Sequence, residues 1–164
     1  MSSQMDSGEI LATVEASPAR RVIGVGMLVG LGLVLLYLSM ISTPGLAWQG
    51  FLLLVAGGAL WMGYRMWHAT AHRIELTAEG LLRCSDGTEI IHISDLQHLD
   101  RGFFAFKPSN GFLMRSKTAG DKCWYPGLWW RLGRRIGVGG VTPGSQTKTM
   151  TEILAAMMVE RDAG

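Results

Sequence analysis

An uncharged run over residues 22–41 constrains the fold of this chain more than any other feature. A helix of these 20 residues is about 30 Å long at 1.5 Å per residue, which is the thickness of a bilayer core. A second run, residues 46–64, has Gln49 as its strongly polar member. A short Pro-Gly linker joins the two runs, so the sequence predicts an antiparallel transmembrane hairpin over residues 22–64.

Two other interpretations of these runs are less favoured than the hairpin. Buried helices of a soluble protein are disfavoured, because a domain of this size rarely buries two uncharged helices on all faces. A signal peptide is disfavoured because the first run is longer than an ordinary signal-peptide core. The 21 residues before it also include three acidic side chains. We therefore expect an uncleaved anchor.

Arginines flank the hairpin and predict its orientation. Arg20 and Arg21 precede the first run, Arg65 and Arg73 follow the second, and the linker has no Lys or Arg. Positively charged flanks remain in the cytoplasm. The prediction is a two-helix protein of the bacterial inner membrane with both termini cytoplasmic. Residues 1–21, rich in serine and small side chains, are predicted to be a disordered leader.

The remaining residues, 65–164, are predicted to form one cytoplasmic domain of short strands. Turn signals occur at 77–80, at the Asp-Gly pair 86–87 and at the Asn-Gly pair 110–111, each between alternating apolar residues. An aromatic run at 103–106 continues this pattern.

The chain ends in a predicted amphipathic helix over residues 145–160. Thr142 is the expected N-cap, with Pro143 at the first helical position. Apolar residues follow at helical spacing: Met150, Ile153, Leu154, Met157 and Met158. This apolar stripe is expected to cover an open face or end of the sheet.

The order of these parts resembles the bacterial pleckstrin-homology-like domain proteins. The segments that carry the resemblance are HRIELTAEGL, GTEIIHISDLQHL and the closing helix, over residues 66–162. It implies a partly open barrel of seven antiparallel strands capped by a helix, and non-catalytic work as an adaptor, assembly factor or ligand-binding module. Residues 126–141, rich in Gly and Arg, depart from the family pattern and do not predict an ordinary strand pair. The string PGLWWRLGRR also resembles membrane proteins of photosynthetic and related alphaproteobacteria.

Candidate ligand-binding residues are few, and we expect no cofactor, no metal and no enzymatic activity. The glycines of residues 24–32 lie inside the predicted membrane helix and follow no strand, so they do not indicate a nucleotide loop. His68 and His72 share a helix face, but two ligands do not make a zinc site. Cys84 and Cys123 are isolated and are expected to be free thiols.

Four glycines in the hairpin are candidates for helix packing. Gly26 and Gly30 form a G-x-x-x-G motif, which allows another helix to approach closely. Gly57 and Gly58 offer a matching flat surface on the second helix. The alternative is that these glycines are incidental, because glycine is common in membrane helices.

The basic charge of the domain is concentrated in one stretch. Residues 65–100 carry a net charge of −3, whereas residues 101–135 carry +7. Within the basic stretch lies a group that we call the Trp/Arg patch: Trp129, Trp130, Arg131, Arg134 and Arg135. Tryptophan favours the headgroup layer and arginine favours phosphate, so the patch predicts contact with anionic lipid headgroups or with a protein. A third interpretation places one tryptophan in the core and leaves the arginines solvated.

Two classes of function are compatible with these features. The first is a membrane-anchored interaction protein, an accessory subunit or assembly factor of a larger inner-membrane complex, with energy-transducing respiratory or photosynthetic complexes as the first candidates. Its partners would be other integral membrane subunits. The second is a lipid- or ligand-sensing module at the membrane surface. Nucleic acid is not expected as a partner, because the net charge of the whole chain is only +2.

Overall fold

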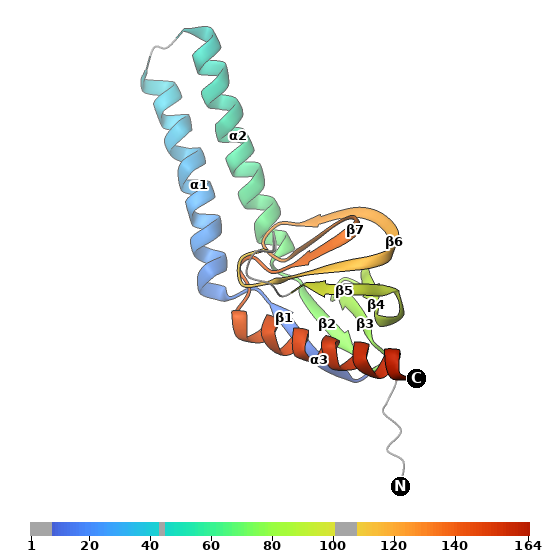
Figure 1. The fold of residues 1–164 in the computed structure, drawn as a ribbon. Coiled ribbons are helices and arrows are strands. Elements are labelled where there is room, and N and C mark those ends of the chain that lie inside the picture. The colour runs from blue at the N-terminus through green and yellow to red at the C-terminus, as the bar shows by residue number, and fades with distance from the viewer. Residues whose placement is uncertain (1–7, 43–44, 101–107) are drawn as a thin grey trace.

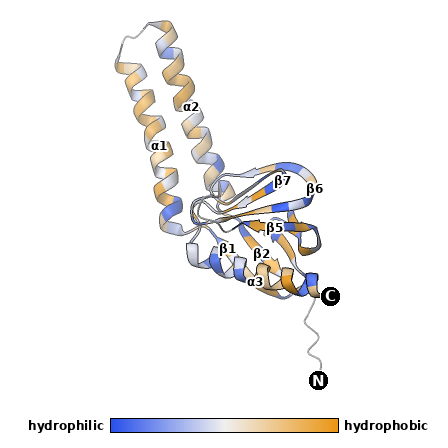
Figure 2. Cartoon of the chain, viewed as in Figure 1, coloured by the Kyte–Doolittle hydropathy of each residue, from blue (hydrophilic) through white to orange (hydrophobic). Residues whose placement is uncertain are grey.

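The computed structural model describes residues 8–42, 45–100 and 108–164. A helical hairpin projects from a small domain of strands and one helix (Figure 1). The hairpin consists of α1 (Pro18–Ile41) and α2 (Leu46–Ala69), which both extend beyond the predicted bounds of 22–64. Both helices are long and apolar enough to cross a membrane. Their surfaces are mainly apolar along most of their length (Figure 2).

The two helices of the hairpin pack at positions where glycine gives room. A Cβ atom at Gly32 would lie 2.6 Å from Leu60 Cγ and 3.2 Å from the carbonyl oxygen of Ala56. A Cβ atom at Gly63 would lie 3.3 Å from Val29 Cγ2. These contacts fix how closely α1 and α2 approach each other.

The four glycines selected from the sequence lie elsewhere on the hairpin. A Cβ atom at Gly26, Gly30, Gly57 or Gly58 would meet nothing within 4 Å in the described part of the chain. The two flat surfaces therefore do not match each other within the hairpin, and that part of the prediction is wrong. Docking of a separate helix at these exposed glycines stays a prediction.

A strand precedes the hairpin, which corrects the predicted disordered leader. β1 (Ile10–Glu15) pairs antiparallel with β2 (Arg73–Thr77), so the whole hairpin is inserted between two neighbouring strands. Val14 on β1 is fully buried in the domain core, and this burial stabilises a strand that the sequence-based prediction missed. Residues 1–7 of the predicted leader lie outside the described residues.

The domain contains two antiparallel sheets with neighbouring strands in chain order. One contains β1, β2, β3 (Leu81–Cys84) and β4 (Glu89–His92), and the other contains β5 (Leu96–Asp100), β6 (Phe112–Tyr125) and β7 (Trp129–Val138). A short 3-10 turn, Ile93–Asp95, connects the sheets. Among the residues that the structure describes, the sheets do not join into a closed barrel.

The predicted turns at 77–80 and 86–87 are confirmed. They connect β2 to β3 and β3 to β4, with Gly80 and Gly87 at positive φ values of 80° and 91°. Asn110, in the turn before β6, has a φ of 52°. The predicted aromatic strand at 103–106 lies outside the described residues.

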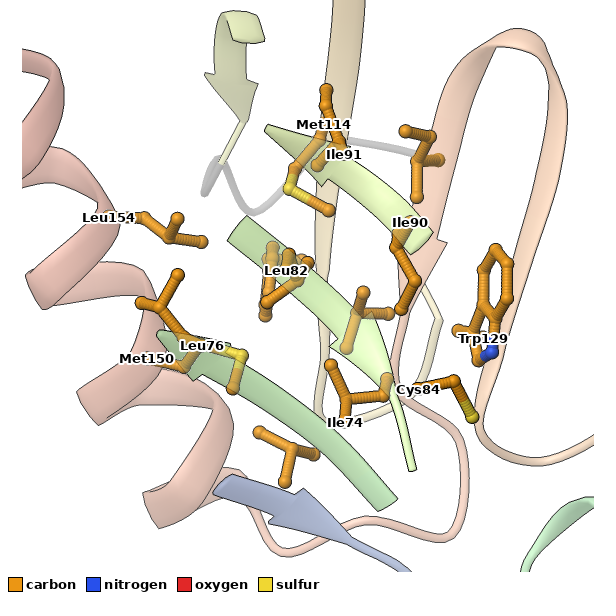
Figure 3. Close-up of a cluster of buried hydrophobic side chains, with 14 of the residues drawn as sticks. Ile74, Leu76, Leu82, Cys84, Ile90, Ile91, Met114, Trp129, Met150 and Leu154 are labelled. Atoms are coloured by element: carbon orange, nitrogen blue, oxygen red, sulfur yellow. The ribbon is translucent and has the colours of Figure 1, made fainter. Parts of the chain in front are cut away.

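One apolar core joins both sheets and the last helix, and side chains from these elements point toward one another (Figure 3). The largest fully buried side chains are Trp129, Phe112, Ile74, Leu76, Leu82, Ile90, Leu96, Met114, Leu128, Ile136, Met150 and Leu154. Burial of one such aliphatic side chain contributes about 1.5–3 kcal/mol.

The predicted C-terminal helix is confirmed as α3 (Gly144–Ala163), which lies against β1 (Figure 1). Pro143, and not Thr142, occupies the N-cap position. Thr142 is buried, and its hydroxyl donates a 3.4 Å hydrogen bond to the carbonyl of Asn110. Near the other end of α3, Arg161 donates from Nη1 to the carbonyls of Ile93 and Leu96, at 2.6 Å each.

Residues 126–141, for which no ordinary strand pair was predicted, contain β7. This strand pairs with β6 in a two-stranded ribbon interrupted by bulges between Arg115 and Cys123. Gly133 adopts a φ of +61° within β7. Glycine tolerates such a conformation, which explains how a glycine-rich segment forms a bent strand.

Candidate functional site

The strand β7 separates the residues of the Trp/Arg patch. Successive side chains of a strand point to opposite faces of the sheet, so five residues on one strand cannot form one surface. Trp129 and Arg131 lie on the domain side. Trp130 is half-buried, and Arg134 and Arg135 are exposed. The sequence-based prediction of a single contact surface is therefore wrong for two of the five residues.

Trp129 belongs to the core, with 1% of its surface exposed. Its ring stacks on Tyr125, with 5.1 Å between ring centroids, at the β6–β7 pair nearest the turn. The side chain cannot reach a lipid or a partner protein. The alternative in which one tryptophan packs in the core is confirmed for Trp129.

Arg131 is held by the domain itself. Its Nη1 donates a 2.8 Å hydrogen bond to the carbonyl of Ile90, and its Nε donates a 3.2 Å bond to the carbonyl of Gly133. The guanidinium occupies the space above Gly120, where a Cβ atom would lie 2.3 Å from Cζ. Arg131 thus ties the ribbon to β4 and has little freedom to bind phosphate.

The ribbon also carries exposed aromatic, apolar and basic side chains. Trp124 on β6 pairs with Trp130 on β7. Trp124 is 45% exposed and Leu132 is 57% exposed. We call Trp124, Trp130, Leu132, Arg134 and Arg135 the exposed ribbon surface. Trp124 and Leu132 were not selected from the sequence, although two-residue alternation from Trp130 points to Leu132.

The ribbon meets the hairpin at the domain end of α2. Arg65 on α2 donates a long 3.5 Å hydrogen bond to the carbonyl of Trp124, and its guanidinium lies 5.5 Å from the Trp61 ring centroid. On α1, Arg21 lies 4.0 Å above the ring of Trp67 and donates to its carbonyl at 2.8 Å. Paired arginines and tryptophans at one helix end are typical of a membrane interface.

A pocket of about 410 Å³ lies between α2 and the ribbon. Its lining residues are Tyr64, Arg65, His68, Ala69, His72, Cys123, Trp124 and Tyr125. His68 and His72, selected as a possible pair of ligands, both line this pocket. The arginine and the aromatic rings give it the composition of a site for an anionic headgroup.

A cluster of three possible metal ligands lies beside this pocket. His72 follows the end of α2, Cys84 ends β3, and Asp86 lies in the β3–β4 turn. One ligand atom from each side chain lies within 4.8 Å of the others. The antiparallel register that pairs Ile74 with Cys84 also brings His72 opposite Asp86. His72 and Cys84 were not predicted to lie together, because their proximity depends on this extended register.

The Asp86 carboxylate is fixed on both oxygens. Tyr125 donates its hydroxyl to Oδ2 at 2.7 Å, and the backbone N–H of Thr88 donates to Oδ1 at 2.9 Å. Partial burial alone would raise the pKa of Asp86, but the hydrogen bonds from Tyr125 and Thr88 outweigh it and lower the pKa to about 2. Asp86 is therefore ionised at neutral pH.

Cys84 and Cys123 are free cysteines, as predicted. Cys84 is fully buried, and this burial raises the pKa of its thiol above the ordinary value of 9.0. Smaller effects from the Asp86 backbone N–H and from the Trp129 indole oppose the rise. The Trp129 Nε1 is thus near enough to affect the thiol. It is buried, however, and makes no hydrogen bond of normal geometry among the described residues.

Comparison of the chain with protein-family models, with curated proteins and with solved structures finds no match.

Proposed function

We propose that this protein is a membrane-anchored interaction protein, an accessory subunit or assembly factor of a larger inner-membrane complex. The observation that carries the proposal is the position of the hairpin glycines. Gly26 and Gly30 form a G-x-x-x-G surface on which added Cβ atoms would meet nothing within 4 Å among the residues that the structure describes. Contact with lipid does not require small residues at these positions, whereas the close approach of another transmembrane helix requires them.

The pairing of β1 with β2 supports the orientation of this anchor. Residues 10–15 and 73–77 form one sheet, so they lie on the same side of any membrane that the hairpin crosses. The arginines beside both helix ends favour the cytoplasmic side. With β1 included, the domain has seven described strands and a closing helix, and we propose that it is a pleckstrin-homology-like fold with the hairpin inserted after the first strand.

The exposed ribbon surface supports a contact next to the anchor. Trp124 and Leu132 combine exposed apolar area with the charges of Arg134 and Arg135. Tryptophan and arginine are enriched among the residues that dominate protein interfaces. We propose that this surface covers a cytoplasmic part of the partner complex. Respiratory or photosynthetic energy-transducing complexes are the first candidates.

A glycine substitution tests the proposal. Gly26→Ile with Gly30→Ile fills the exposed surface without a clash inside the hairpin, so the chain should fold but lose its partner subunits on purification from native membranes. Gly50→Ile is the matched control, because Gly50 is also exposed with nothing within 4 Å and has no glycine four residues away. Equal partner recovery from both variants would refute docking at Gly26 and Gly30.

A lipid-sensing module is the second candidate function, and the pocket beside α2 favours it. Arg65 and His68 line this pocket together with Tyr64 and Trp124. An anionic headgroup would place its phosphate beside the guanidinium and its glycerol against the rings. Under this function, the purified chain would be stable alone and bind vesicles with phosphatidylglycerol more tightly than vesicles with phosphatidylcholine. Arg65→Gln would remove the difference.

A further inference from the structure

The ligand atoms of His72, Cys84 and Asp86 are brought together by a rigid part of the fold. The N–H of Ser85 donates to the carbonyl of Arg73 at 2.9 Å, and the N–H of Arg73 donates to Ser85 Oγ at 3.2 Å. These bonds extend the β2–β3 pairing toward His72. The turn after Cys84 is closed by its own hydrogen bonds, so the three side chains are held before any ligand binds.

The three side chains share one face of the β2–β3 pair. Cys84 lies opposite Ile74, and both point into the core. Residues two positions along each strand point the same way, which puts His72 and Asp86 on the face of Cys84. This explains why a nitrogen, a sulfur and an oxygen ligand lie within 4.8 Å of one another.

The surroundings of the cluster would hold a metal ligand in a fixed orientation. Tyr125 orients the Asp86 carboxylate through a 2.7 Å hydrogen bond and leaves its oxygens with further lone pairs. Groups that hydrogen-bond to ligating carboxylates commonly position metal ligands in this way.

Trp129 supplies an independent observation. Its indole nitrogen is buried and lacks a hydrogen-bond partner among the described residues. In Figure 3 this nitrogen and the sulfur of Cys84 lie on the same side of the core. A neutral thiol is a weak acceptor, whereas a metal-bound cysteine is deprotonated and carries negative charge. Metal binding at Cys84 would thus give the Trp129 N–H the acceptor that it lacks.

We propose that His72, Cys84 and Asp86 form a three-ligand site for a divalent metal of the zinc class. Imidazole and thiolate ligands disfavour magnesium and calcium, which prefer oxygen, and zinc accepts nitrogen, sulfur and oxygen ligands together. Three protein ligands leave a fourth tetrahedral position open. Asp86 is exposed and His72 is half-buried, so the metal can enter from solvent.

The site connects the membrane anchor to the domain. His72 lies three residues beyond the last residue of α2, whereas Cys84 ends β3 and Asp86 lies in the turn after it. A bound metal would fix the end of α2 against β3. This inference is independent of whether the hairpin docks against partner subunits.

Cobalt binding tests the site directly. The full chain, purified in mild detergent and stripped with a chelator, is titrated with Co²⁺ alone. We expect one Co²⁺ per chain, a thiolate-to-cobalt charge-transfer band, visible bands of tetrahedral cobalt, and displacement by Zn²⁺. Cys84→Ser should abolish the charge-transfer band. Cys123→Ser and His68→Gln are matched controls from the neighbouring pocket and should retain it.

Variants of the exposed or half-buried ligands allow Co²⁺ affinity to be measured even if Cys84→Ser does not fold. His72→Gln and Asp86→Asn should weaken Co²⁺ binding at least about tenfold. Tyr125→Phe should weaken it about 10- to 100-fold, because the Asp86 carboxylate loses the hydrogen bond that orients it. Far-ultraviolet circular dichroism would check that each variant is folded. Absence of the charge-transfer band in the wild-type chain, or its loss in Cys123→Ser but not in Cys84→Ser, would overturn the proposal.

Discussion

Replacement of Trp129 by alanine tests how the structure divides the two adjacent tryptophans between core and surface. Trp129 is 1% exposed and stacks on Tyr125. Removal of a buried tryptophan ring costs about 3–5 kcal/mol, because transfer energy is lost and a cavity remains. Trp124→Ala is the matched control. Trp124 is 45% exposed, so its truncation should lower the free energy of unfolding by less than the truncation of Trp129 does.

Urea unfolding of the full chain in detergent, followed by pulse proteolysis of the domain, measures this difference. With a denaturant slope of about 1–3 kcal/mol/M, Trp129→Ala should lower the urea midpoint by at least about 1 M. Trp129→Phe keeps an aromatic ring and should lower the free energy of unfolding by a smaller amount. It can be measured even if Trp129→Ala does not fold. Equal midpoints for Trp129→Ala and Trp124→Ala would refute the assignment of Trp129 to the core.

Two further predictions concern the hairpin and the ribbon. Gly32→Ile should destabilise the hairpin by about 1–3 kcal/mol, because the new side chain would overlap Leu60. Gly26→Ile should not destabilise it, because that position is open. Protease resistance of the two variants in detergent measures the difference, and equal resistance would contradict the packing of α1 on α2. Asp95 accepts hydrogen bonds from Ser116 and Thr118, and these bonds lower its pKa below the ordinary 3.8. Because the folded pKa is the lower one, the stability from Asp95 should be present above pH 3.8 and be lost as the pH falls through the folded value. The difference in unfolding midpoint between wild type and Asp95→Asn should therefore shrink below pH 3.8; a difference that does not depend on pH would contradict this linkage.

The hairpin and the strand turns were predictable because their signals are local. An uncharged run of bilayer length and an Asp-Gly turn each act over a few neighbouring residues, and both were located from the sequence. The predicted helix of 145–160 differs from α3 mainly at its ends. Helix ends depend on single capping residues, and here Pro143 takes the position expected for Thr142.

The strands β1 and β7 were missed because their stability comes from distant contacts. β1 pairs with residues more than fifty positions later, across the whole hairpin. In β7, a bend at Gly133 breaks the regular alternation on which strand prediction relies. The composition of the Trp/Arg patch predicted a surface that contacts lipid or protein. The alternation of side chains along the strand instead places Trp129 and Arg131 on the domain side.

The possible metal ligands show what an extended register adds to a sequence-based prediction. His72 and Cys84 were both noted, but each was assessed with its nearest histidine or cysteine in the chain. Ligand sites form between residues that a sheet places opposite each other. The turn predicted at 77–80 already implies the register that brings His72 to Asp86.

The behaviour of this protein in native membranes decides whether it is a subunit or assembly factor of a membrane complex. The tagged chain would be purified in mild detergent, resolved on a native gel and analysed by mass spectrometry. We predict that it migrates with a fixed set of integral membrane subunits in constant ratio. Migration alone, or as a homo-oligomer, would contradict the claim.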